Sequence, residues 1–187
     1  QTTPGETWDY TATQHMILAD LEFEGKPRKV LMQAPKNGFF YVLDRTDGEL
    51  LSARAYSDMT WASGVDMKTG RPIETPDARV FDGENVSLPS NAGAHNWHPM
   101  SFHPGTGLVY IPSMNIPIRF LAPSNDRDRT PGQGYWNVGF DRIANVPPDV
   151  PNLEEILTGT YTGRLLAWDP AKQQLRWSGE IGPPSGG

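Results

Sequence analysis

The sequence predicts an all-β fold. Gly and Pro account for 19 and 18 of the 187 residues, and they separate short stretches of β-branched and aromatic residues. Each stretch has the length of a strand. Each connector carries Gly, Pro, Asn or Asp, which supply the backbone angles that tight turns need. The pattern is therefore typical of short strands joined by turns.

The first four predicted strands follow one another directly. HMILADLEFE is followed by the turn GKP and by RKVLMQA, and PKNG then leads into FFYVLD, which RTDG returns into ELLSARAY. Segments of strand length with turn residues at every junction favour a meander of short strands. The predicted strands span residues 15–24, 28–34, 39–44 and 49–56.

A weak internal repeat accompanies these strands. VLDRTDGELLS (42–52), GVDMKTGRPIE (64–74) and AWDPAKQQLRW (167–177) have Asp at their third position, and the first two have Gly at the seventh. FHPGTGLVYI (102–111) keeps the Thr-Gly turn. Such a unit is a strand, an Asp that accepts backbone N–H groups across a turn, a Gly with positive φ, and a return strand. Its repetition predicts stacked or radially arranged sheets, and unrelated hairpins with shared turn chemistry are the alternative.

Two long polar insertions separate the repeats, at residues 75–95 and 112–150. Irregular segments of this length are uncommon in compact domains unless they shape a site or a partner surface. We therefore expect loops there.

Composition excludes several functions. The net charge is −6 and Lys and Arg are scattered, so nucleic acid is not an expected partner. The apolar runs KVLMQA and GFFYVL are far shorter than the roughly 20 residues of a membrane-spanning helix, so we expect no membrane segment here. The absence of Cys removes disulfides and thiolate sites from these residues. Phosphate-binding and dinucleotide-binding glycine motifs are also absent, which disfavours nicotinamide and nucleotide-triphosphate chemistry.

Two charged residues are candidates for chemistry. Asp9 lies between Trp8 and Tyr10, where partial desolvation would make its carboxylate a better base, although most Asp residues in such positions only cap turns. Lys36 lies in a Pro-Lys-Asn-Gly turn between two apolar strands. There it is either held rigidly enough to donate to a ligand oxygen or simply solvated.

The segment GAHNWHPMSFHP (93–104) holds three of the four histidines. His95, His98 and His103 invite a metal hypothesis, but no acidic residue completes a ligand set nearby, and a spacing of three in an extended chain puts two rings on opposite faces. We expect structural histidines. Asn96 and Trp97 instead suit a flat, carbonyl-rich ligand.

Together, WDYTATQ, RKVLMQAPKNGFFYVLDRTDGELLSA, TWASGVDMKTGRPIE, GAHNWHPMSFHPGTGLVYIP and TGRLLAWDPAKQQLRW resemble the alcohol dehydrogenases that depend on pyrroloquinoline quinone (PQQ), and most closely the quinohaemoprotein ethanol dehydrogenase type. The resemblance implies an eight-bladed β-propeller of four-stranded antiparallel sheets, of which these residues would cover roughly three blades. A chain that starts at Gln1 and stops at PPSGG then reads as an internal fragment, with residues 1–187 forming part of one PQQ-binding domain. Of the family's Ala-x-Asp-x-x-x-Gly-x-x-x-Trp docking motif, Ala167, Asp169 and Trp177 are present, and Gln173 replaces the Gly.

The resemblance also implies roles for four residues. Asp9 matches the catalytic base that takes the alcohol's hydroxyl proton while hydride passes to PQQ, with the two aromatics walling a dry pocket. Lys36 matches the residue that hydrogen-bonds the quinone oxygens, and Asn96 and Trp97 match a region that contacts PQQ.

A calcium ion, the family's Lewis acid, is the expected metal. Asp9 is the one candidate metal contact in this chain, because the other family ligands lie upstream. Lanthanide-dependent relatives carry a second Asp two residues after the base, where this chain has Thr11, and calcium is therefore favoured.

The implied function is the oxidation of a small primary alcohol to an aldehyde in the periplasm, with cytochrome c or a similar protein as electron acceptor. A haem c group is compatible with a domain outside these residues. Two alternatives remain open. One is a PQQ-dependent dehydrogenase of a sugar, polyol or other alcohol, and the other is a non-catalytic propeller scaffold, which has no need of Asp9, Lys36 and Asn96.

Overall fold

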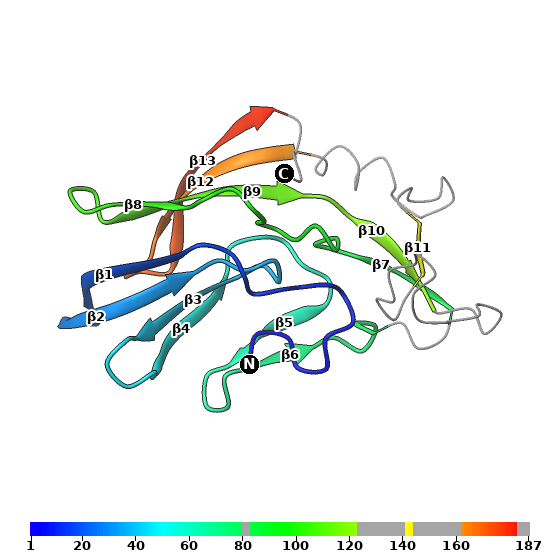
Figure 1. Cartoon of the computed structure of the whole chain (residues 1–187), viewed down its shortest axis with the longest axis horizontal. Coiled ribbons are helices and arrows are strands. Elements are labelled where there is room, and N and C mark those ends of the chain that lie inside the picture. The colour runs from blue at the N-terminus through cyan, green and yellow to red at the C-terminus, as the bar shows by residue number, and fades with distance from the viewer. Residues whose placement is uncertain (80–82, 123–140, 144–161, 183–187) are drawn as a thin grey trace, which may run out of the picture.

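A computed structural model of the chain describes residues 1–79, 83–122, 141–143 and 162–182. All regular secondary structure in these ranges is strand, arranged in four antiparallel sheets (Figure 1). The all-β prediction is confirmed.

The first sheet contains the four strands predicted from the N-terminal meander, in the order β1-β2-β3-β4. One turn is tighter than expected. Phe23 pairs with Lys26, so the turn consists of Glu24 and Gly25, which have φ values of 51° and 73°. Two consecutive positive φ angles are what a two-residue hairpin requires, and the rest of the predicted GKP turn therefore belongs to the second strand. The strands are β1 (Met16–Phe23), β2 (Lys26–Gln33), β3 (Phe39–Asp44) and β4 (Leu50–Ala55).

A second four-stranded sheet packs against the first one. Its order is β13-β12-β9-β8, and it lies across the first sheet in Figure 1. The core between them is built from alternate apolar residues of both sheets, and the rings of Phe40 and Trp168 meet there with centroids 5.8 Å apart. The described residues thus complete two of the four-stranded sheets that the resemblance predicts. The strands of the second sheet are β8 (Ser101–His103), β9 (Leu108–Asn115), β12 (Thr162–Asp169) and β13 (Gln174–Gly182).

The predicted loops are partly strand. Residues 84–87 of the first insertion pair with residues 118–121 of the second, and the latter also pair with residues 141–143. The expectation of irregular loops is wrong at these positions, because each insertion supplies backbone hydrogen-bond partners for the other. Ile118 and Phe120, two residues apart, are both buried in the core. This three-stranded sheet consists of β7 (Glu84–Ser87), β10 (Ile118–Leu121) and β11 (Asp141–Ile143). A separate hairpin of β5 (Ala62–Asp66) and β6 (Arg71–Glu74) forms the fourth sheet.

The repeat is confirmed by its turn geometry. The Asp44 carboxylate accepts the Thr46 N–H at 2.9 Å, and Asp66 and Asp169 accept backbone N–H groups at 2.9 and 3.0 Å. Hydrogen bonds from Thr46 lower the pKa of Asp44. Four residues after the Asp, the φ values are 85°, 67° and 53°, although the third position is not glycine. The residues at that position are Gly48, Gly70 and Gln173.

The fourth copy of the turn has a histidine in place of the Asp. His103 Nδ1 accepts the Thr106 N–H at 3.2 Å, and the His103 carbonyl accepts the Gly107 N–H at 2.9 Å. Gly107 keeps the positive φ, at 69°. His103 therefore has a structural role, as expected for these histidines.

The docking motif keeps a buried Ala and a tryptophan opposite it. Ala167 is fully buried and pairs with Trp177 across β12 and β13. The Trp177 ring lies 6.0 Å from that of Tyr110 and is 46% exposed. In the described residues, Trp177 thus covers its own sheet and leaves its other side open.

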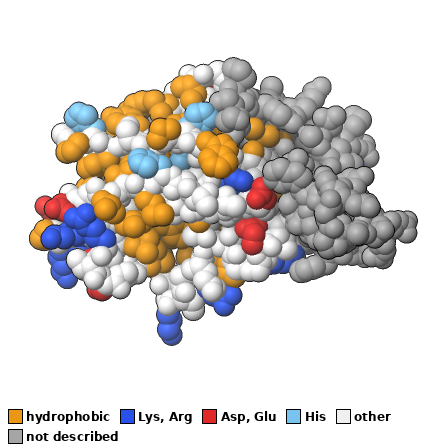
Figure 2. Space-filling model, viewed as in Figure 1, with side chains coloured by type: hydrophobic (Ala, Val, Ile, Leu, Met, Phe, Trp, Pro, Cys, Tyr) orange, Lys and Arg blue, Asp and Glu red, His pale blue; other side chains and the backbone are white. Residues whose placement is uncertain are grey.

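The surface carries no dominant basic patch on the face that Figure 2 shows, where Lys and Arg side chains lie among acidic ones or singly. No helix within the described ranges has the length and apolar character needed to cross a membrane.

The positive φ at Gly48 predicts the effect of a substitution. Gly48→Ala places a Cβ in open space, so its cost is the left-handed backbone alone, about 1–2 kcal/mol of unfolding free energy. Gly64→Ala is the matched control, because Gly64 also faces open space but lacks the positive φ, and we expect no loss there. Denaturant unfolding measures both, and equal stabilities for the two variants would contradict the turn assignment.

Candidate functional site

The segment that carries Asp9 is anchored by its two aromatic neighbours. Trp8 and Tyr10 are buried, and their rings stack with centroids 5.6 Å apart. Both rings also contact Trp61, at 5.0 and 5.5 Å. The Trp8 indole donates to the Ala78 carbonyl at 2.8 Å. These contacts fix the backbone on both sides of Asp9.

Asp9 itself is partly exposed. Its side chain has 39% of its surface accessible, and its φ is 67°, a left-handed conformation that Asp tolerates better than most residues. The arrangement differs from the expected dry pocket, because the two rings lie in the core rather than around the carboxylate. Both rings pack in the same apolar cluster, and the carboxylate between them contacts Lys36 instead.

Lys36 is held, as the rigid-turn interpretation predicts, rather than solvated. It is only 8% exposed, and its Nζ donates to the Asp9 carbonyl at 3.0 Å and to Asp9 Oδ2 at 3.3 Å. A buried ammonium needs such acceptors, since its charge is costly to remove from water. An ammonium has three N–H donors, and these two bonds leave one for another acceptor.

Asn37 stabilises the turn that carries Lys36. Its side chain donates to Tyr41 Oη at 2.9 Å and accepts the Phe39 N–H at 3.1 Å. The Asn37 carbonyl accepts the Trp61 indole N–H at 2.9 Å. The aromatic cluster that anchors Asp9 therefore also holds the turn of Lys36.

The segment that carries Asn96 docks onto the same turn. The Ala94 N–H donates to the Lys36 carbonyl at 2.9 Å. Asn96 is 7% exposed, and its Oδ1 has no hydrogen-bond partner among the described residues. Trp97 is 73% exposed. The structure thus brings Asp9 and Lys36 into contact, places Asn96 in a segment paired with Lys36, and leaves Trp97 at the surface of the described part.

Sequence reasoning missed Gly93. Its φ is 86°, and a Cβ there would lie 2.4 Å from Cγ of Lys36 and 2.7 Å from its Cα. Only glycine allows this close approach. The glycine in GAHNW gave no signal of its own, because the contact joins segments far apart in the chain.

The role of His95 is structural, as expected. Its ring is fully buried, with Nδ1 2.6 Å from the Ala34 carbonyl and Nε2 2.6 Å from the His98 carbonyl. Burial lowers the pKa of His95, and the two carbonyls oppose this by favouring an N–H on each ring nitrogen. Within the described ranges, no three His, Asp or Glu side chains gather in a way that would hold a metal ion.

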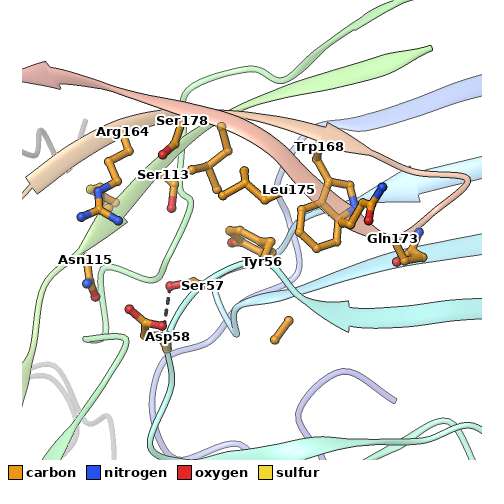
Figure 3. A pocket seen from close by; sticks show the side chains of 14 residues that line it. Tyr56, Ser57, Asp58, Ser113, Asn115, Arg164, Trp168, Gln173, Leu175 and Ser178 are labelled. Carbon is orange, nitrogen blue, oxygen red and sulfur yellow. Dashed lines mark hydrogen bonds between the residues drawn. The ribbon is translucent and has the colours of Figure 1, made fainter.

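A separate cavity of about 500 Å³ lies between the end of β4 and strands β9, β12 and β13 (Figure 3). Tyr56, Trp168 and Leu175 give it an apolar side, and Asp58 and Arg164 a charged one. None of the four predicted site residues lines this cavity.

The chain is similar in sequence to known dehydrogenases. Residues 1–60 match the family described as glucose/ethanol/alcohol dehydrogenase, beta-propeller domain. The chain is 49% identical, over 95% of its length, to the quinohemoprotein alcohol dehydrogenase ADH-IIG of Pseudomonas putida. It is 43% identical over its whole length to the 1-butanol dehydrogenase (cytochrome c) of Thauera butanivorans. It covers 25% and 26% of these two proteins, so it spans about a quarter of their length.

A solved structure shows the same fold. The crystal structure of the quinohemoprotein alcohol dehydrogenase from Comamonas testosteroni superposes with a TM-score of 0.83 and 46% identity. The match covers 98% of this chain and 27% of that one. This chain belongs to the PQQ-dependent quinohaemoprotein alcohol dehydrogenase family. The two packed four-stranded sheets are accordingly part of a β-propeller, and the predicted fold class is confirmed.

Two observations show that the site fits the family's cofactor. Lys36 has a spare N–H for a quinone oxygen, and the buried Oδ1 of Asn96 lacks a partner among the described residues. A quinohaemoprotein site at this place would use both groups without breaking the contact between Lys36 and Asp9.

The close approach at Gly93 predicts a strong effect of a single methyl group. Gly93→Ala forces the Cβ and Cγ atoms of Lys36 to move and adds left-handed strain. We expect at least about 2 kcal/mol of lost unfolding free energy, with weaker binding of PQQ. Gly107→Ala is the control, with a similar φ of 69° and nothing within 4 Å. Equal losses in the two variants would show that the contact with Lys36 has no importance.

Proposed function

We propose that the full-length protein containing this chain is a quinoprotein dehydrogenase that oxidises primary alcohols to aldehydes in the periplasm. Residues 1–187 form part of its single PQQ-binding propeller domain. The observation that carries the proposal is the contact of the buried Lys36 ammonium with both the carbonyl and the carboxylate of Asp9. The names of the relatives, which include alcohol and 1-butanol dehydrogenases, support the substrate class.

Asp9 is the proposed general base. Its carboxylate is partly exposed, so a substrate hydroxyl can reach it, and its backbone is held on both sides by buried aromatics. The base must lie within hydrogen-bond distance of the hydroxyl proton that it removes. Bound PQQ would accept the hydride from the alcohol carbon, and a calcium ion would polarise the quinone carbonyl.

Lys36 and Asn96 are the proposed cofactor contacts. The free N–H of Lys36 would donate to a quinone oxygen, where negative charge grows during the reaction. Asn96 offers a buried amide whose oxygen has no partner among the described residues. Trp97 offers an exposed indole ring for stacking on a flat ligand.

Calcium is the proposed metal, with Asp9 as its contact in this chain. The support is the neutral Thr11 at the position where lanthanide-dependent relatives carry a second Asp. A neutral hydroxyl provides a weaker ligand for a trivalent ion than a carboxylate does.

The proposed electron acceptor is a cytochrome c or a similar protein, and a haem c domain elsewhere in the full-length protein fits this function. The support lies in the relatives' names, which contain "quinohemoprotein" and "cytochrome c".

The description of the matching family also names glucose, which supports a sugar or polyol as the alternative substrate of the same cofactor. A non-catalytic scaffold is less consistent with the site. A scaffold needs the turns and the sheet contacts, but it gains nothing from burying Lys36 against a partly exposed Asp9.

The general base is tested by Asp9→Asn in the full-length protein. The variant keeps the backbone carbonyl that binds Lys36, so PQQ should stay bound, while alcohol oxidation should fall by at least about 100-fold because the base is lost. A dye-linked assay measures turnover, and the PQQ absorbance measures cofactor content.

Asp20→Asn is the matched control for this substitution. Asp20 pairs with Arg45 at the exposed surface, where an ion pair contributes little, so turnover should not change. An Asp9→Asn enzyme as active as the control would refute the role of the base.

Removal of the metal separates the enzyme from a scaffold. Chelation should abolish alcohol oxidation by the purified protein, and added calcium should restore it together with the PQQ spectrum, because the proposed metal polarises the quinone. A protein that shows no PQQ absorbance and no response to calcium would favour the scaffold.

A further inference from the structure

The two turns that carry the proposed cofactor contacts come from distant parts of the chain. Lys36 follows β2, and Asn96 precedes β8, so no local turn geometry sets the distance between them. Because both side chains must reach one rigid cofactor, the groups that join the two turns decide how well they fit it.

The backbone provides one connection. The Ala94 N–H binds the Lys36 carbonyl at 2.9 Å, and the Ala94 carbonyl accepts the Met114 N–H of β9 at 2.8 Å. These bonds attach both turns to the second four-stranded sheet. Both bonds are made by Ala94, which precedes Asn96, and neither holds the residues that follow Asn96.

The His95 side chain provides the second connection. Nδ1 lies 2.6 Å from the carbonyl of Ala34, two residues before Lys36. Nε2 lies 2.6 Å from the carbonyl of His98, two residues after Asn96. The ring is fully buried and planar, so it sets a nearly constant distance between these two carbonyls.

We propose that His95 is a positioning residue of the cofactor site, whose imidazole holds the Lys36 turn and the Asn96 segment at the spacing that PQQ requires. The proposal rests on the function proposed above. His95 does not touch the cofactor in this account. It acts through Lys36 and Asn96, and its loss should weaken the binding of PQQ even where the protein remains folded.

The substitutions follow from the two carbonyl contacts. His95→Leu removes both contacts between the ring nitrogens and the carbonyls and keeps an apolar side chain of moderate size, whereas His95→Gln keeps an amide N–H that can donate to one carbonyl. We expect the dissociation constant for PQQ to rise about tenfold or more in the Leu variant and by a smaller factor in the Gln variant. The assay is equilibrium binding of PQQ to the metal-loaded full-length protein, well below the melting temperature.

A double-mutant cycle with Lys36→Met tests whether His95 acts through Lys36. If His95 positions Lys36, the effect of His95→Leu on PQQ binding should be much smaller once Lys36 is already Met. Fully additive effects would overturn the positioning role while leaving the proposed function in place. If Lys36→Met alone leaves PQQ binding unchanged, the proposed role of Lys36 is wrong, and the positioning role of His95 fails with it.

The matched control is His103→Leu, which removes another histidine hydrogen bond, in the β8–β9 turn, outside the site. This variant should lose stability without a change in PQQ affinity. If His95→Leu does not fold, the same cycle is run with His95→Gln. An equal loss of PQQ affinity in the His95 and His103 variants would show a general effect of destabilisation and overturn the proposal.

Discussion

The burial of the Lys36 ammonium is the constraint on which the site depends. An ammonium taken out of water needs acceptors, and Asp9 supplies both its carbonyl and its carboxylate. Asp9 offers both from a left-handed backbone that is flanked by buried rings on either side. The same ring cluster, through Trp61, binds the carbonyl of the residue after Lys36. One packed group of aromatics therefore supports the proposed base and the proposed cofactor contact together.

The repeated turn is stabilised by the same kind of hydrogen bond in each of its copies. Three Asp residues and His103 each accept a backbone N–H two or three residues later, and a positive φ follows four residues after each of them. The side chain can change from carboxylate to imidazole because the turn needs only an acceptor. Gln173 shows that the φ is likewise a requirement of the hairpin, which an L-residue adopts when the strands on both sides are already paired.

Several features of the site were predictable only in part. For Lys36 the sequence allows either a rigidly held or a solvated side chain, and its burial agrees with the held one. The two aromatics beside Asp9 were expected to surround it, but both pack in the core against Trp61, and the carboxylate contacts Lys36 instead. The insertions were expected to be loops, yet each provides the strand partner that the other needs, and such pairing between distant segments leaves no local pattern.

The strands outside the two insertions, the turns and the repeat follow from the sequence alone, because Gly, Pro and turn Asp act over a few neighbouring residues. The sequence also indicated Asp9, Lys36 and Asn96, through the resemblance that their surrounding motifs carry. Three contacts were visible only in the folded protein: Lys36 binds Asp9, Gly93 lies against the stem of Lys36, and His95 joins the turn before Lys36 to its own segment. The contacts of Lys36 with Asp9, of Gly93 with Lys36 and of His95 with Ala34 join residues 27 to 61 positions apart, and their geometry is set by how the sheets pack rather than by any local preference of the chain.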